Sequence, residues 1–221
     1  MGHGKYIDPF ATDLSGFTTG GLPPQTPCVA TLRNPLGQAY YQIQAGETLR
    51  LQYVVLPGES RDIDVFVDLV GPGAQLEIKA LYLCNASEKV NLNFLVHHRA
   101  PGCKSTQLIK GIAGGEAQVQ FHGTIVVAPD AQQTEAYQEN HNILLSETAK
   151  VETQPQLEIY ADDVKCSHGA TVGRLNQDEL FYMRSRGVPE KEARTLQMLS
   201  FLSPVIPEGR QEEIVTNLLN L

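Results

Sequence analysis

Cys166 and His168 are the two side chains in this sequence whose types and spacing come closest to a metal site. Residues two apart on a β-strand point to the same face, so a thiolate and an imidazole at this spacing can approach one ion. Both groups are ligands that iron accepts, but two donors do not complete a coordination shell. The alternative reading is that Cys166 is a small buried apolar residue and that His168 is held by hydrogen bonds.

A second group of candidate ligands, His97, His98 and Cys103, is weaker. Consecutive strand residues point to opposite faces, so His97 and His98 cannot share one ion. We therefore expect this segment to be a solvated strand end. The adjacent acids Asp162 and Asp163 would suit glycoside chemistry, but acids in turns commonly bond their own backbone.

Several classes of function are disfavoured by motifs and charge. The sequence contains neither a phosphate-binding GxxxxGK[ST] run nor a GxSxG nucleophile elbow, so we expect no bound nucleotide and no serine triad. A net charge of −8 argues against nucleic acid as a partner. The four cysteines form no CxxC pair, which is typical of free thiols in a reducing compartment. No long apolar run is present, so we expect a cytoplasmic protein without a membrane partner.

The elements that would position Cys166 and His168 are short β-strands. Alternating apolar and polar residues between turn-forming Gly, Pro, Asn and Asp predict strands over residues 40–44, 49–56, 63–70, 75–83, 90–97, 106–112, 118–127 and 156–160. No helical segment separates these strands, which excludes a sheet of βαβ units. A sandwich, a barrel and a β-solenoid stay open, and the absence of Asn-Gly and Asp-Gly hairpin turns favours the solenoid.

The two ends of the chain differ from this middle part. Residues 1–35 are rich in Gly and Pro, which predicts an irregular arm without ladder strands. Residues 36–173 form the expected β core, and residues 174–221 change to helical periodicity. Asn176 and Glu179 resemble a capping box for a helix over 177–186 that ends at Gly187.

Two more helices are expected after that one. The first begins at Pro189 and carries an apolar stripe of Ala193, Leu196, Leu199 and Leu202. The second covers residues 211–221, after Pro204 and Pro207 have interrupted the chain.

Several ordered motifs carry a resemblance to a known family. Residues 157–173 read LEIYADDVKCSHGATVG, residues 180–189 read LFYMRSRGVP, and residues 192–194 read EAR. Their order and spacing resemble the SufB/SufD family of the SUF iron–sulfur cluster assembly system. SufB chains carry a glutamate after the matching histidine and SufD chains a glycine, so Gly169 makes this sequence SufD-like.

The resemblance implies a right-handed parallel β-helix with a C-terminal helical subdomain. It implies a scaffold subunit, not an enzyme, that pairs with a SufB-type chain or with a second copy of itself and binds a SufC-type ATPase. It places His168 and, less directly, Cys166 at the assembly interface, where they would meet iron or a transient iron–sulfur cluster. The residues implied in docking the ATPase follow the β core: Leu180, Phe181, Tyr182, Arg184, Arg186, Gly187, Val188 and Pro189.

The sequence departs from the family pattern in two respects. Members usually have a helical N-terminal region and a longer β-helix, so we expect either a minimal member or a shortened one. SufB chains also carry a cysteine in the segment that matches residues 138–142, and none is present here. An alternative from another class is a carbohydrate-active or carbohydrate-binding β-solenoid, against which the absence of Trp counts. A degenerate member that serves only as a structural partner is a third possibility.

Overall fold

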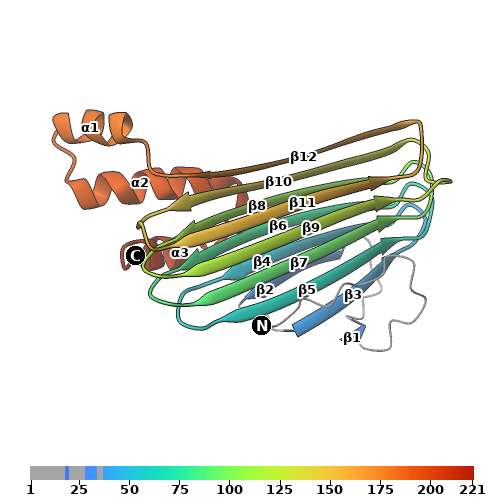
Figure 1. Cartoon of the computed structure of the whole chain (residues 1–221), viewed down its shortest axis with the longest axis horizontal. Helices are drawn as coiled ribbons and strands as arrows, with labels where there is room; N and C mark the ends of the chain where they lie inside the picture. The colour runs from blue at the N-terminus through green and yellow to red at the C-terminus, as the bar shows by residue number, and fades with distance from the viewer. Residues whose placement is uncertain (1–17, 20–27, 34–36) are drawn as a thin grey trace.

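The chain folds into a solenoid of short strands with a helical appendage at one side (Figure 1). The computed structural model describes residues 18–19, 28–33 and 37–221. In these residues the strands are β1 (Thr18–Thr19), β2 (Cys28–Arg33), β3 (Gly37–Ile43), β4 (Thr48–Val55), β5 (Arg61–Leu69), β6 (Gln75–Cys84), β7 (Lys89–His98), β8 (Lys104–Ala113), β9 (Gln118–Val127), β10 (Thr134–Leu144), β11 (Lys150–Ile159) and β12 (Val164–Gly173). The helices α1 (Gln177–Ser185), α2 (Glu190–Leu202) and α3 (Gln211–Leu218) follow, with a short 3₁₀ turn, η1 (Ser203–Val205), between α2 and α3.

Successive strands alternate between two parallel sheets. Sheet A has the order β1-β3-β5-β7-β9-β11 and sheet B the order β12-β10-β8-β6-β4-β2. Each strand therefore bonds to the strands two before and two after it, so the chain coils round a common axis. This topology confirms the β-helix and rules out the antiparallel sandwich and the barrel, which the periodicity had left open.

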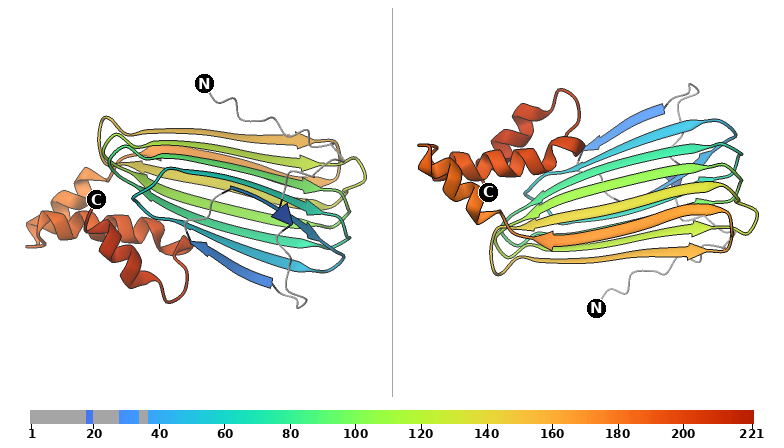
Figure 2. Two further views of the ribbon diagram at one scale, coloured as in Figure 1. Left: turned by 90° about the horizontal axis from the view of Figure 1, so that it is seen from below. Right: turned by 90° about the horizontal axis from the view of Figure 1, so that it is seen from above.

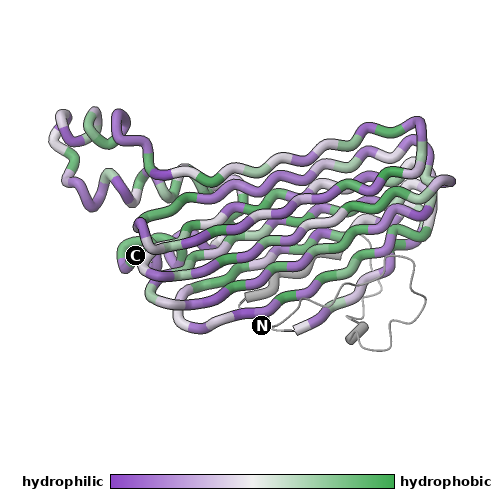
Figure 3. Tube along the Cα trace, viewed as in Figure 1, coloured by the Kyte–Doolittle hydropathy of each residue, from purple (hydrophilic) through white to green (hydrophobic). Residues whose placement is uncertain are grey.

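The core is the thin space between the two sheets. Hydrophilic and hydrophobic residues alternate along many strands, and the apolar set faces inward (Figure 3). The rings of Tyr53, Phe94 and Phe121 pack there in tilted and edge-to-face arrangements, with centroid distances of 5.5 Å and 5.9 Å between successive rings. Because the register is constant, each inward side chain sits directly above the one in the next rung, and the core is a set of columns.

Two columns contain glycine because a large side chain crosses the core from a neighbouring rung. A Cβ atom at Gly111 would overlap the ring of buried Tyr82, and one at Gly123 would lie 2.5 Å from the Gln138 amide. Tyr82 and Gly111 are in register on β6 and β8. The absence of a side chain at Gly111 is thus the condition for burying Tyr82.

The eight predicted strands coincide in order with β3 to β9 and with the last part of β11, which begins at Lys150 instead of residue 156. Two strands of the middle part are omissions. β10 and β12 were not predicted, because both carry polar or small residues at inward positions, such as Gln138 and Ala170. The expectation of an arm without ladder strands is wrong for residues 18–19 and 28–33, since β1 pairs with β3 and β2 pairs with β4. Pro27 and Pro35 flank residues 28–33 without interrupting them. The rest of the expected arm lies outside the described residues.

The helical appendage packs on the outer face of sheet B. As predicted, the Asn176 side chain caps α1 by accepting hydrogen bonds from the backbone N–H groups of Asp178 and Glu179, and Gly187 takes a positive φ of 89° after the helix. The apolar face of α2 is only partly as predicted, because Leu196 is half exposed while Met198 is buried. The cluster that joins the helices to sheet B contains Val54, Leu81, Leu83, Ile112, Leu180, Ala193, Met198, Leu202, Val205, Ile214 and Leu218.

His97 and His98 point to opposite faces as predicted, but the expectation of a solvated strand end is wrong. His98 faces the core, is fully buried, and shares a 2.8 Å hydrogen bond between its Nε2 and the Ser105 hydroxyl. His97 lies on the outer face in register with Val126 and is also buried. Burial, followed by the proximity of His97, lowers the pKa of His98 to about 3.

None of the helices in the described part of the chain combines the length and the apolar character that crossing a bilayer requires.

We predict that Gly111→Ala destabilises the fold by about 2 to 3 kcal/mol, because the new methyl group must displace the Tyr82 ring. Adding Tyr82→Leu to this variant should recover part of the loss, since the smaller side chain leaves room. Chemical denaturation of both single variants and of the double variant measures this coupling. Strictly additive changes would contradict the interlocked column.

We also predict acid sensitivity that arises from His98. The folded state excludes a proton that the unfolded histidine accepts near its ordinary pKa of 6.5, so stability is complete above that pH and falls as the pH drops toward 3. His98→Asn should reduce the loss of unfolding free energy between pH 7.5 and pH 4.5 by about 2 kcal/mol. Urea titrations at both pH values test this, and parallel profiles would show that His98 does not contribute.

Candidate functional site

The last rung of the solenoid, formed by β11 and β12, is left uncovered. These strands are the edges of sheets A and B, and in the described residues neither has a strand on its other side. The chain leaves β12 toward the helices, which lie beside the strand ends and not across the end of the stack (Figures 1 and 2). The inward-facing side chains of the rung are therefore partly open, and Ile159 and Val172 are exposed apolar residues there.

Cys166 and His168 both lie on β12 and point to the same inward face, as their spacing predicted. Cys166 is in register with Ala136, and His168 with Gln138. The Cys166 thiol is half-buried against a small apolar cluster, and burial raises its pKa despite a backbone hydrogen bond at Ala136. His168 is exposed at the open end. The structure thus brings the two predicted ligands together on one side of one strand.

These two side chains do not form a complete site within one chain. Among the described residues, no group of three or more His, Cys, Asp or Glu side chains is placed to hold a metal ion. A raised pKa keeps the Cys166 thiol protonated at neutral pH, so a soft metal would have to displace its proton. Further ligands for iron would have to come from a second chain at the open end or from the bound species.

Beneath His168 lies a buried polar layer that the sequence reasoning missed. Gln138 Nε2 donates to Gln107 Oε1 over 3.1 Å, and Asn142 Nδ2 donates to Asn140 Oδ1 over 2.6 Å and to the Thr171 carbonyl over 3.1 Å. All four amide side chains are buried. The signal was present as alternating amides at residues 138, 140 and 142, which stand where the other rungs carry apolar residues.

This polar layer is not fully paired. Gln138 Oε1, Gln107 Nε2 and Asn140 Nδ2 have no hydrogen-bond partner among the described atoms. A buried polar group without a hydrogen-bond partner lowers the stability of the fold. Its presence in a core therefore suggests a role other than stability. The position of these groups makes the interior next to His168 polar, unlike the apolar interior of the earlier rungs.

The open edge of β12 also has a defined backbone pattern. The Glu135 N–H donates to the Cys103 carbonyl on the β8 side, so odd-numbered residues of β10 face β8 and even-numbered ones face β12. Ala136 lies opposite Cys166, and in a parallel ladder a residue bonds to the two neighbours of the residue opposite it. The odd-numbered residues of β12 therefore make the backbone hydrogen bonds to β10. The N–H and C=O groups of Cys166, His168 and Ala170 consequently point outward, to the open edge.

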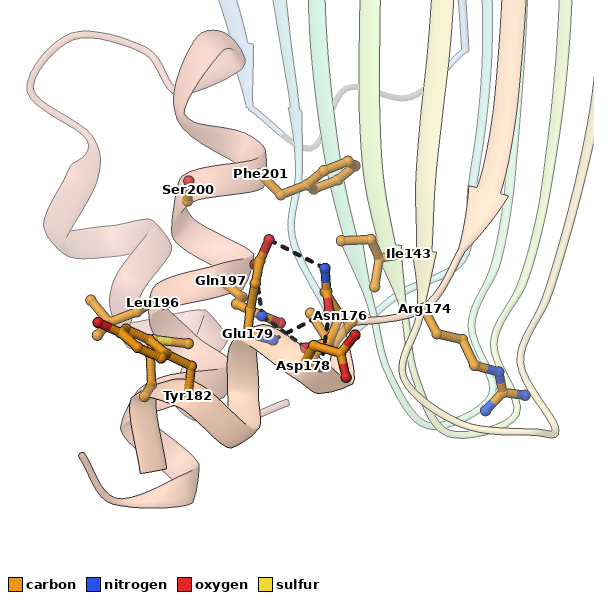
Figure 4. Close-up of a pocket in the computed structure, with 12 residues that line it drawn as sticks. Ile143, Arg174, Asn176, Asp178, Glu179, Tyr182, Leu196, Gln197, Ser200 and Phe201 are labelled. Atoms are coloured by element: carbon orange, nitrogen blue, oxygen red, sulfur yellow. Dashed lines mark hydrogen bonds between the residues drawn. The ribbon is translucent and has the colours of Figure 1, made fainter. Parts of the chain in front are cut away.

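A second surface lies between the helices and the end of β10. A cavity of about 710 Å³ is lined by Ile143, Arg174, Leu175, Asn176, Asp178, Glu179, Tyr182, Met183, Leu196, Gln197, Ser200 and Phe201 (Figure 4). Gln197 Nε2 donates to Glu179 Oε2 and to the Asn176 carbonyl, which ties α2 to the start of α1. The cavity therefore has a fixed polar floor and an apolar side formed by Tyr182 and Leu196.

The residues predicted to dock an ATPase divide into two groups. Phe181 and Tyr182 are 73% and 59% exposed, large values for aromatic side chains. Arg186 lies 5.3 Å from the Tyr182 ring centroid, and Arg184 lies 3.5 Å from Glu190. Leu180 is buried in the appendage and Val188 packs partly into it, so these two support the surface from within. Gly187 and Pro189 form the connection between α1 and α2.

Comparison with known proteins places most of the chain in one family. Residues 35–201 match the family model described as SUF system FeS cluster assembly, SufBD core domain. The chain is 38% identical to the iron–sulfur cluster assembly protein SufD of Escherichia coli over 151 residues, which cover 68% of this chain and 36% of that protein.

Two further relatives show the same pattern. An iron–sulfur cluster assembly SufBD family protein of Mycobacterium leprae is 32% identical over 166 residues, covering 72% of this chain and 42% of that protein. The SufD protein of Bacillus subtilis is 30% identical over 154 residues, covering 70% of this chain and 35% of that protein. The chain thus spans well under half the length of these relatives.

Proposed function

The chain belongs to the SufBD core family, and on this premise we propose that it is a scaffold subunit for iron–sulfur cluster assembly. In this role it pairs with a second SufB/SufD-type chain and binds a SufC-type ATPase, which supplies nucleotide hydrolysis. The observation that carries the proposal is the uncovered last rung, where Cys166 and His168 lie on the open strand. Family membership takes precedence over a carbohydrate-binding solenoid, which no feature of the described residues favours.

The open rung supports pairing because solenoids normally cover their ends. Repeated rungs bury each other, and a terminal rung without a cap exposes both apolar residues and unpaired backbone groups. The N–H and C=O groups of Cys166, His168 and Ala170 point away from β10. A strand of a partner chain can form backbone hydrogen bonds to them and so extend sheet B. Pairing would cover Val172 and complete the interior above the polar layer.

The assembling cluster is the cargo of such a scaffold and not a resident cofactor. Cys166 and His168 supply two donors on one face, so an iron or cluster bound there would take its other ligands from the partner chain. The unpaired amide nitrogens of Asn140 and Gln107 give this interior hydrogen-bond donors that suit sulfide or a negatively charged cluster. Incomplete coordination by each single chain also suits a cluster that is later transferred to another protein.

The helical appendage is the part proposed to bind the ATPase. Phe181 and Tyr182 are exposed, and Tyr182 lines the cavity; aromatic and arginine residues are the most frequent anchors of protein interfaces. The appendage is packed on sheet B through a continuous apolar cluster. A displacement of the helices by the ATPase would therefore be transmitted to the sheet whose edge is β12.

The experiment that tests this function is anaerobic reconstitution of the chain with iron, sulfide, a SufB-type chain and a SufC-type ATPase. We expect the complete mixture to develop the visible absorption of an iron–sulfur cluster, and His168→Ala to reduce it. An unchanged spectrum with His168→Ala would remove this residue from the ligands. Absence of any complex with both partners would overturn the proposed function.

Ala170→Pro is predicted to weaken pairing while leaving the subunit folded. The Ala170 N–H points to the open edge, so proline removes a donor from the partner interface but none from the β10–β12 ladder. We expect the dissociation constant of the pair to rise at least about tenfold, as measured by analytical ultracentrifugation. Ala170→Val keeps the N–H and is the matched control, and equal affinities of the two variants would contradict pairing through β12.

Phe181→Ser together with Tyr182→Ser is predicted to weaken binding of the SufC-type ATPase by at least about tenfold, because both aromatic anchors are lost. Both side chains are largely exposed, so the thermal unfolding midpoint should stay nearly constant. Calorimetric titration of the ATPase into the variant measures the loss. Tyr137→Ser, at an exposed tyrosine on β10, is the control and should leave binding unchanged.

A further inference from the structure

A ladder of two buried glutamine side chains ends beneath His168. Gln107, Gln138 and His168 are in register on β8, β10 and β12, on the inward-facing side of each strand. Gln138 Nε2 donates to Gln107 Oε1 over 3.1 Å, so the nitrogen of the Gln138 amide is bound to the preceding rung. In a stack of amides in register, the nitrogen faces one neighbour and the oxygen faces the other. Gln138 Oε1 is therefore directed to the last rung.

Gln138 Oε1 needs a hydrogen-bond donor. The Gln138 side chain is fully buried, and this oxygen has no partner among the described residues. A buried acceptor without a partner lowers the stability of the fold, so a donor that reaches it is bound favourably. The residue in register on the next strand is His168, whose ring carries at least one N–H group in every protonation state that proteins populate.

The Gln138 amide is held in one position by its packing. A Cβ atom at Gly123 on β9 would lie 2.5 Å from Gln138 Nε2 and 2.6 Å from Gln138 Oε1, so the amide rests directly against the backbone across the core. The hydrogen bond to Gln107 fixes it on a second side. The acceptor therefore has a fixed direction, whereas the ring of His168 is exposed and can turn toward it.

The other wall of the last rung offers His168 no acceptor at the same level. Gly123, which contacts the Gln138 amide, is in register with Pro155 on β11. The side chain across the core from His168 is therefore a proline ring, which has no hydrogen-bonding group. Thr153 Oγ1 also lacks a partner among the described residues, but Thr153 is in register with Phe121 and not with Gly123.

We propose that Gln138 is a positioning residue for His168: its Oε1 accepts a hydrogen bond from the Nε2–H group of the imidazole, which leaves Nδ1 with the free electron pair. The choice of nitrogen follows from reach. Oε1 of a glutamine and Nε2 of a histidine are the same number of bonds from Cα, so in register they lie at the same depth in the core. Nδ1 lies nearer the strand, closer to the depth of the Cys166 sulfur.

The inference rests on the proposed function, in which His168 is a ligand of iron or of a cluster, and it identifies what prepares that ligand. Histidine ligands of metals usually donate their second ring N–H to an acceptor, which fixes the tautomer and makes the ligating nitrogen more basic. Here the acceptor comes from the interior of the solenoid, while the ligand is at its open end. The unpaired oxygen of the polar layer thereby gains a role other than stability.

Proton–nitrogen correlation NMR of the histidine rings, on the complete chain at neutral pH and at a concentration that keeps it monomeric, tests the hydrogen bond. An exposed ring N–H exchanges with water too fast to be observed unless a hydrogen bond holds it. We expect a cross-peak from His168 Nε2–H, assigned by its loss in His168→Ala. Gln138→Met should abolish this cross-peak, and Gln138→Glu, which keeps an acceptor oxygen, should retain it.

Two control variants separate the acceptor from the rest of the polar layer. Gln107→Met removes the same hydrogen bond between the two glutamines but keeps Gln138 Oε1, so the cross-peak should persist. Thr153→Val removes the other unpaired oxygen and should also leave it in place. Absence of the cross-peak from the unaltered chain, its persistence in Gln138→Met, or its loss in both controls as well would each overturn the positioning role.

Titration with Co(II) alone, as a substitute for iron(II), tests whether the hydrogen bond matters for binding. Paramagnetic broadening of the His168 ring signals reports the dissociation constant. We expect this constant to rise about tenfold in Gln138→Met and to change less than about twofold in Gln107→Met. Equal affinities of Gln138→Met and the unaltered chain would overturn the inference. Neither measurement involves a partner chain or cluster formation, so a failed reconstitution would refute the proposed function and leave the hydrogen bond between Gln138 and His168 standing.

Discussion

Each rung of this solenoid is stable only because another rung covers it. The parallel ladders satisfy the backbone groups, and the aligned columns bury the side chains, at offsets of 27 residues between Arg50 and Glu77 and 32 residues between Gln118 and Lys150. An arrangement of this kind cannot satisfy its own last rung. The open β11 and β12 edges are therefore a direct result of the architecture, and the chain either caps them or uses them. The helices, which could have formed a cap, pack on the flank of sheet B.

The interior changes in character toward that open end. In the earlier rungs the columns are apolar and aromatic, as with Tyr53, Phe94 and Phe121. On β8 and β10 the inward side chains include the buried amides of Gln107, Gln138, Asn140 and Asn142. This polar layer lies next to the rung that carries Cys166 and His168. Buried amides weaken the core locally, so specific hydrogen bonds contribute more to this end of the solenoid than to the earlier rungs, beside the apolar cluster that contacts Cys166. A chain that only needed stability would have kept the apolar columns.

Much of the fold was predictable from the sequence, and the exceptions have physical causes. Alternation located β3 to β9, since their inward residues are apolar, and the capping residues Asn176 and Gly187 located α1. β10 was missed because inward Gln138, Asn140 and Asn142 break the apolar alternation that defines a half-buried strand. That Cys166 and His168 point to the same face of one strand was predictable from their spacing alone. The polar layer below them was not, because the register that stacks Gln138 on Gln107 is a long-range property. The burial of His97 and His98 was missed for a similar reason: the layers that cover a strand end are remote in sequence.

The nearly constant offset between bonded strands has a bearing on how the chain is made. From the β3–β5 ladder onward, each ladder closes a segment of 26 to 32 residues. This is a short loop with a small entropic cost, so rungs can form one after another as the polypeptide leaves the ribosome. At each stage of translation the nascent chain exposes one fresh pair of strand edges, and the next stretch of synthesis covers it. In the part of the chain that the structure describes, the edges of β11 and β12, the rung that carries Cys166 and His168, stay uncovered by a later strand. The time during which a strand edge is open to aggregation is thereby limited for each rung that a later rung covers, whereas the edges of β11 and β12 are the ones proposed to need a partner chain.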